Sequence, residues 1–294
     1  VNRVHYSADP DKNPATEKGR AWREEAQKGI SKSRWNKEHE IEYHALSGER
    51  LYPEYSTELN DCEPFDVSDT THWTIWQGAD PHGRTPHAHA WVAFNGRGDI
   101  AVCGELWPAG RYAVRDYVEA IQWFESDSKE KPLAWEWANG KKLSVHHRVM
   151  DTHGHAIDAE EGVDYFKKYR FPWDADDAAF QDKEGLIYRE AKKSDLGSVR
   201  DAIGELLMPM QTENGPAARM RIFRSCTETR SEFGNVRYPP TSSGMAERPS
   251  QERPMTYRKH CLDCIHYVFA ENPGFVLPVR GGDTFVPIYA GTGH

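Results

Sequence analysis

Apolar residues gather most densely between residues 73 and 107, where polar residues, glycine and proline mark the breaks between apolar segments. Three segments there predict β-strands: "WTIWQGAD" (73–80), "HAHAWVAF" (87–94) and "IAVCGELW" (100–107). The turn residues "NGRGD" between the second and third segments predict a hairpin. Two further strands are predicted in "VHHRVMD" (145–151) and "ARMRIFRSC" (218–226).

Helical spacing dominates elsewhere. Helices are predicted in "RYAVRDYVEAIQWFESDS" (111–128), from about Ser194 in "AKKSDLGSVRDAIGELL", in "TETRSEFGNVRY" (227–238) and in "YRKHCLDCIHYVFA" (257–270). Residues 1–60 are polar with helix-like spacing of their apolar positions, and "LAWEWANGKKLSV" (133–145) predicts a second hairpin. Antiparallel strands followed by helices and single strands predict an α/β domain with one sheet of mixed direction.

Composition limits the class of protein. The chain has 294 residues, of which 38% are hydrophobic, so it can build one large core with appendages. None of its apolar runs approaches the roughly 20 residues that a membrane span needs. Five scattered cysteines, an odd number, favour a reduced, cytosolic protein. The net charge of −9 argues against general nucleic-acid binding but leaves room for a local basic groove.

Three aspartates interrupt apolar surroundings. Asp80 and Asp151 each end a predicted strand, and Asp263 lies inside the apolar helix "HCLDCIHY". Any one of them alone is more often a turn former or helix cap than a ligand. Three carboxylates brought together, however, cannot all stay ionised without a cation, and oxygen ligands suit Mg²⁺ or Mn²⁺. The pattern therefore predicts a divalent metal site.

The segments "GADPHG", "VMDTHGHA" and "KHCLDCIHYVF", in this order, resemble the nuclease domain of the large terminase subunit of tailed bacteriophages. The resemblance extends over most of residues 70–272. It implies an α/β, RNase H-like (resolvase-like) fold with a central mixed sheet flanked by helices and a helical N-terminal linker segment. The implied domains are a linker (1–66) leading from an ATPase domain, a nuclease domain (67–275) and a tail (276–294). The Gly-x-x-x-x-Gly-Lys-Ser/Thr phosphate-binding motif does not occur in the sequence, so the ATPase domain is expected to lie outside it.

By the same resemblance, Asp80, Asp151 and Asp263 form a catalytic, metal-binding triad. His260, one helical turn before Asp263, and Glu105 are further candidate ligands, although Glu105 could equally form an ordinary salt bridge. Two Mg²⁺ or Mn²⁺ ions, roughly 3.5–4 Å apart, would cleave concatemeric double-stranded viral DNA by phosphodiester hydrolysis during genome packaging. The loop after Asp80 carries histidines where relatives carry another acid.

DNA contact requires cations along the phosphate backbone. The candidates are Lys192 and Lys193 in "REAKKSD" and Lys167 and Lys168 in "YFKKYR", each of which could equally be an ordinary solvated side chain. The resemblance implies double-stranded DNA, the small terminase subunit, the portal protein and the ATPase domain as partners. It places the protein in the cytoplasm of the infected host cell, with no membrane partner.

Two alternatives from other classes remain open. A zinc-dependent, amidohydrolase-like hydrolase would draw ligands from the histidines at 87, 89, 146, 147, 153 and 155. A structural zinc site could also use the cysteines and histidines of "HCLDCIH". The other alternative is a catalytically silent docking module with an RNase H-like core.

Overall fold

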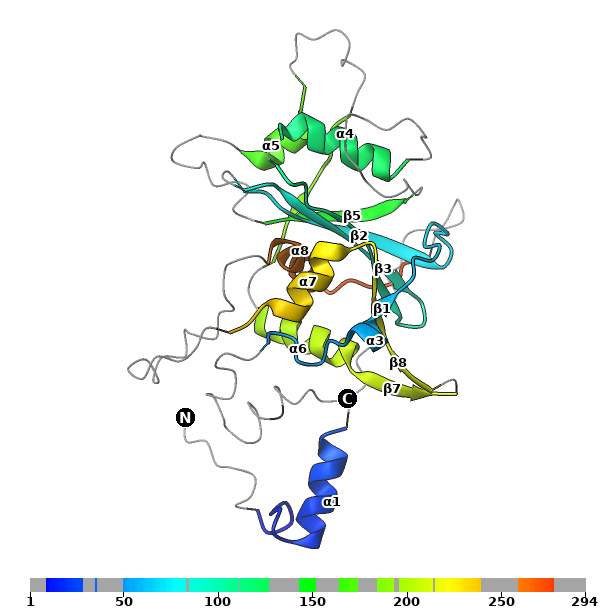
Figure 1. The fold of residues 1–294 in the computed structure, drawn as a ribbon, viewed down its shortest axis with the longest axis vertical. Coiled ribbons are helices and arrows are strands. Elements are labelled where there is room, and N and C mark those ends of the chain that lie inside the picture. The colour runs from blue at the N-terminus through cyan, green and yellow to red at the C-terminus, as the bar shows by residue number, and fades with distance from the viewer. Residues whose placement is uncertain are drawn as a thin grey trace, which may run out of the picture. The chain divides into compact units, whose positions relative to one another are not determined.

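The computed structural model describes residues 9–28, 35, 50–82, 85–110, 112–126, 143–151, 164–173, 184–192, 196–213, 215–238 and 259–277 (Figure 1). Its helices are α1 (Glu17–Ala26), α3 (Thr57–Asn60), α4 (Val114–Phe124), α5 (Tyr165–Arg170), α6 (Leu196–Leu207), α7 (Thr227–Asn235) and α8 (His260–Ala270). Its strands are β1 (Asp61–Cys62), β2 (Trp73–Asp80), β3 (Ala88–Asn95), β4 (Ile100–Leu106), β5 (Val145–Met150), β6 (Arg189–Glu190), β7 (Pro209–Thr212), β8 (Gly215–Ala218) and β9 (Met220–Phe223). Among these residues, no helix is both long and apolar enough to cross a membrane.

The chain divides into two compact units. One comprises residues 61–196, 220–230 and 259–294, and the other comprises residues 1–60, 197–219 and 231–258. The first unit holds a seven-stranded sheet in the order β1-β9-β4-β3-β2-β5-β6. β2, β3 and β4 form an antiparallel meander, whereas β5 joins β2, and β9 joins β4, in parallel. The sheet is therefore mixed, as the sequence predicts.

Helices cover both faces of this sheet. Figure 1 shows α4 and α5 on one face and α8 on the other. On the α4 face, Trp91 of β3 packs against Phe124 with ring centroids 4.6 Å apart. On the α8 face, the Cys264 thiol donates to the Ala88 carbonyl at 3.3 Å. The strands are buried on both faces, which explains why their sequences are nearly continuous apolar runs.

Gly78 lets helix α8 lie directly on β2. A Cβ atom at this position would come within 2.1 Å of the Cys264 carbonyl oxygen, a backbone atom that cannot swing away. Because side chains alternate along a strand, Gly78 and Asp80 face the same side, the side of α8. The absence of a side chain at Gly78 therefore brings the helix close to Asp80.

The second unit is built around aromatic side chains and a hairpin. Tyr52 and Tyr55 pack on Phe233 with ring centroids 5.0 and 5.5 Å apart. The Asn60 side chain donates to the Leu207 carbonyl at 3.1 Å, which ties α3 to the end of α6. β7 and β8 pair in an antiparallel hairpin.

The main strands and helices predicted from the sequence are confirmed within the described residues. The sequence did not predict the short elements α3, α5, β1 and β6 or the β7–β8 hairpin, and the hairpin predicted at 133–145 lies almost wholly outside the described residues. Because β1 belongs to the sheet, the sheet begins upstream of residue 67, where the nuclease domain was predicted to start. The domain boundaries themselves remain predictions.

Replacing Gly78 with alanine is expected to destabilise the protein by about 3 kcal/mol, because the new methyl group must push the backbone of α8 away from β2. Urea denaturation measures this loss. Gly274→Ala is the matched control, since nothing lies within 4 Å of a Cβ there, and it should change stability by less than about 0.5 kcal/mol. Equal stability of both variants would contradict the close approach of α8 to β2.

Candidate active site

Asp80 and Asp151 lie side by side at one edge of the sheet. β2 and β5 are parallel neighbours with Ala79 opposite Met150, so both strands end at the same edge. The Asp151 backbone N–H donates to the Ala79 carbonyl at 3.0 Å, which continues the pairing to the two aspartates. Both side chains are buried, with 8% and 5% of their surface exposed, respectively.

Helix α8 brings the third aspartate to the same corner. Asp263 lies in its first turn, next to Cys264, whose backbone meets Gly78 and whose thiol contacts Ala88. Ala88 is the residue directly opposite Asp80 in the β2–β3 ladder. The three aspartates predicted to converge, from positions as far apart as 80 and 263, are therefore near neighbours in the fold.

The electrostatics of Asp80 reflect this convergence. Burial raises the pKa of Asp80, a hydrogen bond from His260 opposes the rise, and the charges of Asp263 and Asp151 raise it further. Burial also raises the pKa of the Tyr267 phenol, and the charges of Asp80, Asp263 and Asp151 add to that rise. The Tyr267 hydroxyl thus stays protonated and available as a donor.

Each of the three carboxylates has a donor from the α8 segment. The Tyr267 hydroxyl donates to Asp151 Oδ2 at 2.7 Å, and His260 Nδ1 lies 2.8 Å from Asp80 Oδ2. The Lys259 ammonium donates to both oxygens of Asp263, at 2.8 and 2.5 Å. Burial alone would raise the pKa of Asp263, but hydrogen bonding from His266 and the charge of Lys259 outweigh burial and leave that pKa lowered.

The chemistry of these acids fits a divalent cation, although their present arrangement does not form a cage. Carboxylate oxygens are the ligands that Mg²⁺ and Mn²⁺ prefer. Burial and, after it, the charges of Asp263 and Asp151 raise the pKa of Asp80, and a bound cation would relieve both effects. In the described part of the chain, however, no three His, Cys, Asp or Glu side chains are already grouped so that they could hold a metal ion. Their oxygens contact Lys259, His260 and Tyr267 instead.

His260 is the centre of a small ring cluster at this corner. Its imidazole stacks on Trp107, which follows β4, with centroids 4.8 Å apart and planes 14° apart. His82, in the loop after Asp80, lies edge-on to His260 at 6.2 Å. The predicted ligand His260 is thus beside Asp80, where its Nδ1 is engaged by the carboxylate.

Glu105 has another role in the structure. Its two oxygens accept hydrogen bonds from the backbone N–H groups of Glu228, at 2.9 Å, and Thr229, at 2.7 Å. A carboxylate placed there caps the first turn of α7 and is favoured by the helix dipole. Because both oxygens accept hydrogen bonds from the α7 backbone, we do not include Glu105 in the proposed metal site.

The predicted DNA-binding lysines differ in their surroundings. Lys192 is bound to Glu271 at the end of α8, through its backbone N–H at 2.9 Å and its ammonium at 3.1 Å, so its charge is already paired. Lys167 and Lys168 are exposed on the short helix α5. Lys193 lies outside the described residues. The role of all four in DNA binding remains a prediction.

Those histidines of the zinc alternative that the structure describes do not gather at one place. His87 and His89 point into the α4 face, where His87 Nδ1 and His89 Nε2 lie 2.8 and 2.9 Å from the Tyr169 hydroxyl. His146 accepts from the Ile75 N–H at 3.2 Å, and His147 packs on a tryptophan. His153 and His155 lie outside the described residues. Within the described residues, the histidines serve packing and hydrogen bonding.

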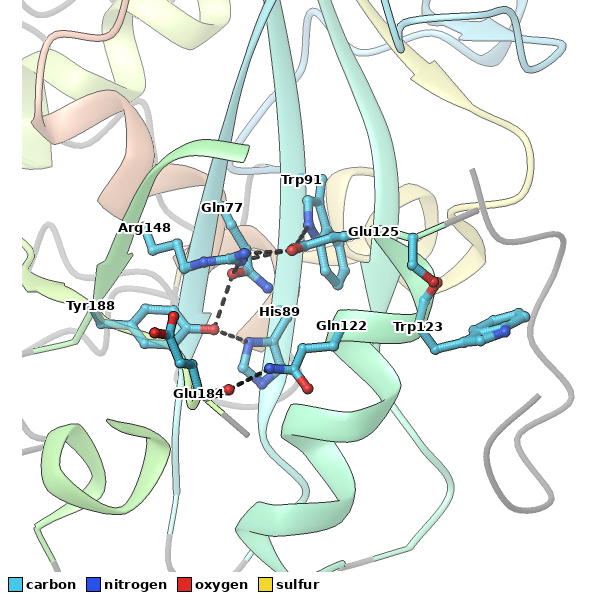
Figure 2. A network of polar contacts seen from close by, with 10 residues as sticks. Gln77, His89, Trp91, Gln122, Trp123, Glu125, Arg148, Glu184 and Tyr188 are labelled. Carbon is cyan, nitrogen blue, oxygen red and sulfur yellow. Dashed lines mark hydrogen bonds and ion pairs between the residues drawn. The ribbon is translucent and has the colours of Figure 1, made fainter. Parts of the chain in front are cut away.

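Figure 2 shows the buried polar network behind the acid-bearing strands. Arg148 of β5 donates to Gln77, the residue beside it on β2, and forms a two-pronged ion pair with Glu125 at the end of α4. Trp91 Nε1 also donates to Glu125, at 2.9 Å, and the Tyr188 hydroxyl donates to Gln77 at 3.0 Å. This network ties β2 and β5 together on the face opposite Asp80 and Asp151.

Two partners in this region were not predicted from the sequence. Lys259 was missed, although its i, i+4 spacing to Asp263 is the spacing at which helical ion pairs form. Arg148 was missed because its partners, Gln77 and Glu125, are 71 and 23 residues away in the sequence. Tyr267 lies in "KHCLDCIHYVF", one of the segments that carry the resemblance, and its hydrogen bond to Asp151 was not predicted.

The sheet order, the mixed strand directions and the helices on both faces define an α/β fold of the RNase H-like class, with the acid cluster at the end of β2 and β5. Among solved structures with this fold is the P22 large terminase nuclease domain, to which this chain is 14% identical with a TM-score of 0.51. That match covers 78% of this chain and 94% of the P22 domain.

A second similar structure is the large terminase of a thermophilic bacteriophage in complex with ADP. It is 12% identical, with a TM-score of 0.55, and the match covers 87% of this chain. The chain spans about half of that thermophilic-phage protein, 52% of its length. A scan of protein-family models finds no match, and a search of curated proteins finds none either. The terminase nuclease fold expected from the sequence is confirmed.

Replacing Arg148 with methionine is expected to lower the free energy of unfolding by about 3 kcal/mol, because Glu125 is left buried without its cation. The double variant Arg148→Met/Glu125→Gln should recover part of that loss. Arg224→Met is the matched control, since its ion pair with Glu63 is exposed, and it should cost less than about 1 kcal/mol. Chemical denaturation measures all of these variants. A double variant less stable than Arg148→Met would show that the pair does not carry the stability of this network.

Proposed function

We propose that this chain is a divalent-metal-dependent endonuclease that cuts double-stranded DNA, the nuclease portion of a phage large terminase. The observation that carries the proposal is the convergence of Asp80, Asp151 and Asp263 at one corner of an RNase H-like sheet. The similarity in fold to the P22 domain and to the thermophilic-phage terminase supports the same function.

The three aspartates would hold the cation. Bound there, a divalent cation supplies an activated water molecule and neutralises charge on the phosphate being cleaved. The chain's own contribution is geometry. The β2–β5 pairing sets the positions of Asp80 and Asp151, and the hydrogen bond from Tyr267 orients Asp151. His260, held by Trp107, is placed beside Asp80 and is the candidate for a further ligand or a phosphate contact.

DNA would be held by cationic side chains around this corner. Lys167 and Lys168 are exposed and belong to α5, whose Tyr165 and Tyr169 pack on His87, one residue before β3. β3 begins opposite Asp80, so α5 lies near the same end of the sheet as the acids, on the face opposite α8 (Figure 1). With a net charge of −9, the chain alone should bind DNA weakly and with little sequence preference.

Within a packaging motor, this nuclease would cut concatemeric viral DNA in the host cytoplasm. Its partners would be the ATPase domain of the full subunit, the small terminase subunit and the portal protein. The thermophilic-phage large terminase, of which this chain spans about half, was solved with ADP bound.

Digestion of supercoiled plasmid tests the proposal. The wild-type chain should nick and linearise the plasmid with Mn²⁺ or Mg²⁺ and leave it intact with EDTA. Asp80→Asn, Asp151→Asn and Asp263→Asn, which preserve side-chain size, should each reduce the rate at least about 100-fold because each removes a ligand of the cation.

Asp11→Asn is the control, because the ion pair of Asp11 with Lys18 is exposed on the surface. That variant should cut at the wild-type rate. Digestion by Asp80→Asn at the wild-type rate, or digestion in EDTA, would refute the proposed metal site. Tight retention of zinc with no response to Mn²⁺ would favour the zinc hydrolase instead.

A further inference from the structure

The negative charge of the three aspartates is compensated within the chain itself. In a partly buried site, three ionised carboxylates require positive or hydrogen-bond-donating partners. The α8 segment supplies at least one for each acid: Lys259 for Asp263, with His266 Nδ1 also 3.5 Å from that carboxylate, His260 for Asp80 and Tyr267 for Asp151. Lys259 is the only alkylammonium among these four.

Lys259 forms a close ion pair with Asp263. Its ammonium contacts both carboxylate oxygens, and the two side chains are only 16% and 17% exposed, so water screens the pair weakly. An oxygen that accepts a hydrogen bond from an ammonium cannot at the same time face a metal ion with its full negative charge. A cation that takes Asp263 as a ligand must therefore displace Lys259 or share the carboxylate with it.

We propose that Lys259 is a built-in counter-ion that competes with the divalent cation for Asp263 and sets the concentration of metal at which the site fills. This inference rests on the proposed metal site and adds a determinant of its affinity. It gives Lys259 two opposite effects: the ammonium stabilises the metal-free protein and weakens metal binding. A lysine that served only as structural support would stabilise the fold without weakening the affinity for metal.

The test compares Mn²⁺ binding by the wild type and by Lys259→Met, which keeps the approximate length of the side chain and removes its charge. Binding is measured by isothermal titration calorimetry, with no DNA present, and thermal unfolding is followed with and without Mn²⁺. Lys259→Met should bind Mn²⁺ on the order of tenfold more tightly, since a neighbouring opposite charge shifts a carboxylate equilibrium by roughly one to three pK units. Its melting temperature without metal should fall by a few degrees.

Two further variants complete the design. Lys259→Arg keeps the charge and should bind Mn²⁺ with near wild-type affinity, and it remains informative if Lys259→Met does not fold. Lys28→Met removes a lysine paired with Glu25 near the end of α1, where the lysine side chain is 70% exposed, and should leave Mn²⁺ affinity unchanged.

The outcomes separate the two proposals. Wild-type affinity in Lys259→Met, or weaker binding, would overturn the counter-ion role while leaving the metal site in place. Tighter binding by Lys259→Arg as well as by Lys259→Met would also overturn it, because the charge would then not be the cause. Failure of the wild type to bind Mn²⁺ at all would overturn both the metal site and the competition.

Discussion

Repulsion among three carboxylates, two of them buried and the third half-buried, is the constraint around which this end of the molecule is organised. The fold places Asp80 and Asp151 at the ends of adjacent parallel strands and brings Asp263 to them on a helix. That arrangement raises the pKa of Asp80, first through burial and then through its two acidic neighbours. Folding therefore concentrates acidic side chains at one corner, and hydrogen-bond donors from the α8 segment offset their charge.

The two faces of the sheet contribute differently to this site. On the α8 face, Gly78 allows the helix to approach, so that acids and donors meet. On the opposite face, Arg148 binds Gln77 of the neighbouring strand and Glu125 of α4, which fixes β2 and β5 beside each other. Successive side chains of a strand point to opposite faces of the sheet. Neighbouring residues of one strand therefore contribute to the acid site on one face and to the supporting network on the other. The acid site and the polar network that supports it are thus built on the same short strands.

Much of this could be predicted from the sequence, because the information is local. The short apolar segments in residues 73–107 indicated the strands, and the aspartates that interrupt apolar segments indicated the site candidates. The partners of those aspartates depend on side chains far apart in the chain, such as Tyr267 and Asp151, which are 116 residues apart. Glu105 shows the same limit: its position at the end of a strand resembles that of Asp80, yet α7 packs there and takes both its oxygens.

Identity to the P22 and thermophilic-phage structures is only 14% and 12%. We attribute this low identity to the small number of positions that the acid site constrains. Topology and the alternation of side chains alone put the ends of β2 and β5 on one corner, whichever apolar residues fill the strands. What must be specified is an acid at each strand end, a small residue where α8 crosses β2, and countercharge for the acids. The countercharge can come from several kinds of side chain, so it is free to vary. In this chain, Lys259 supplies the countercharge for Asp263.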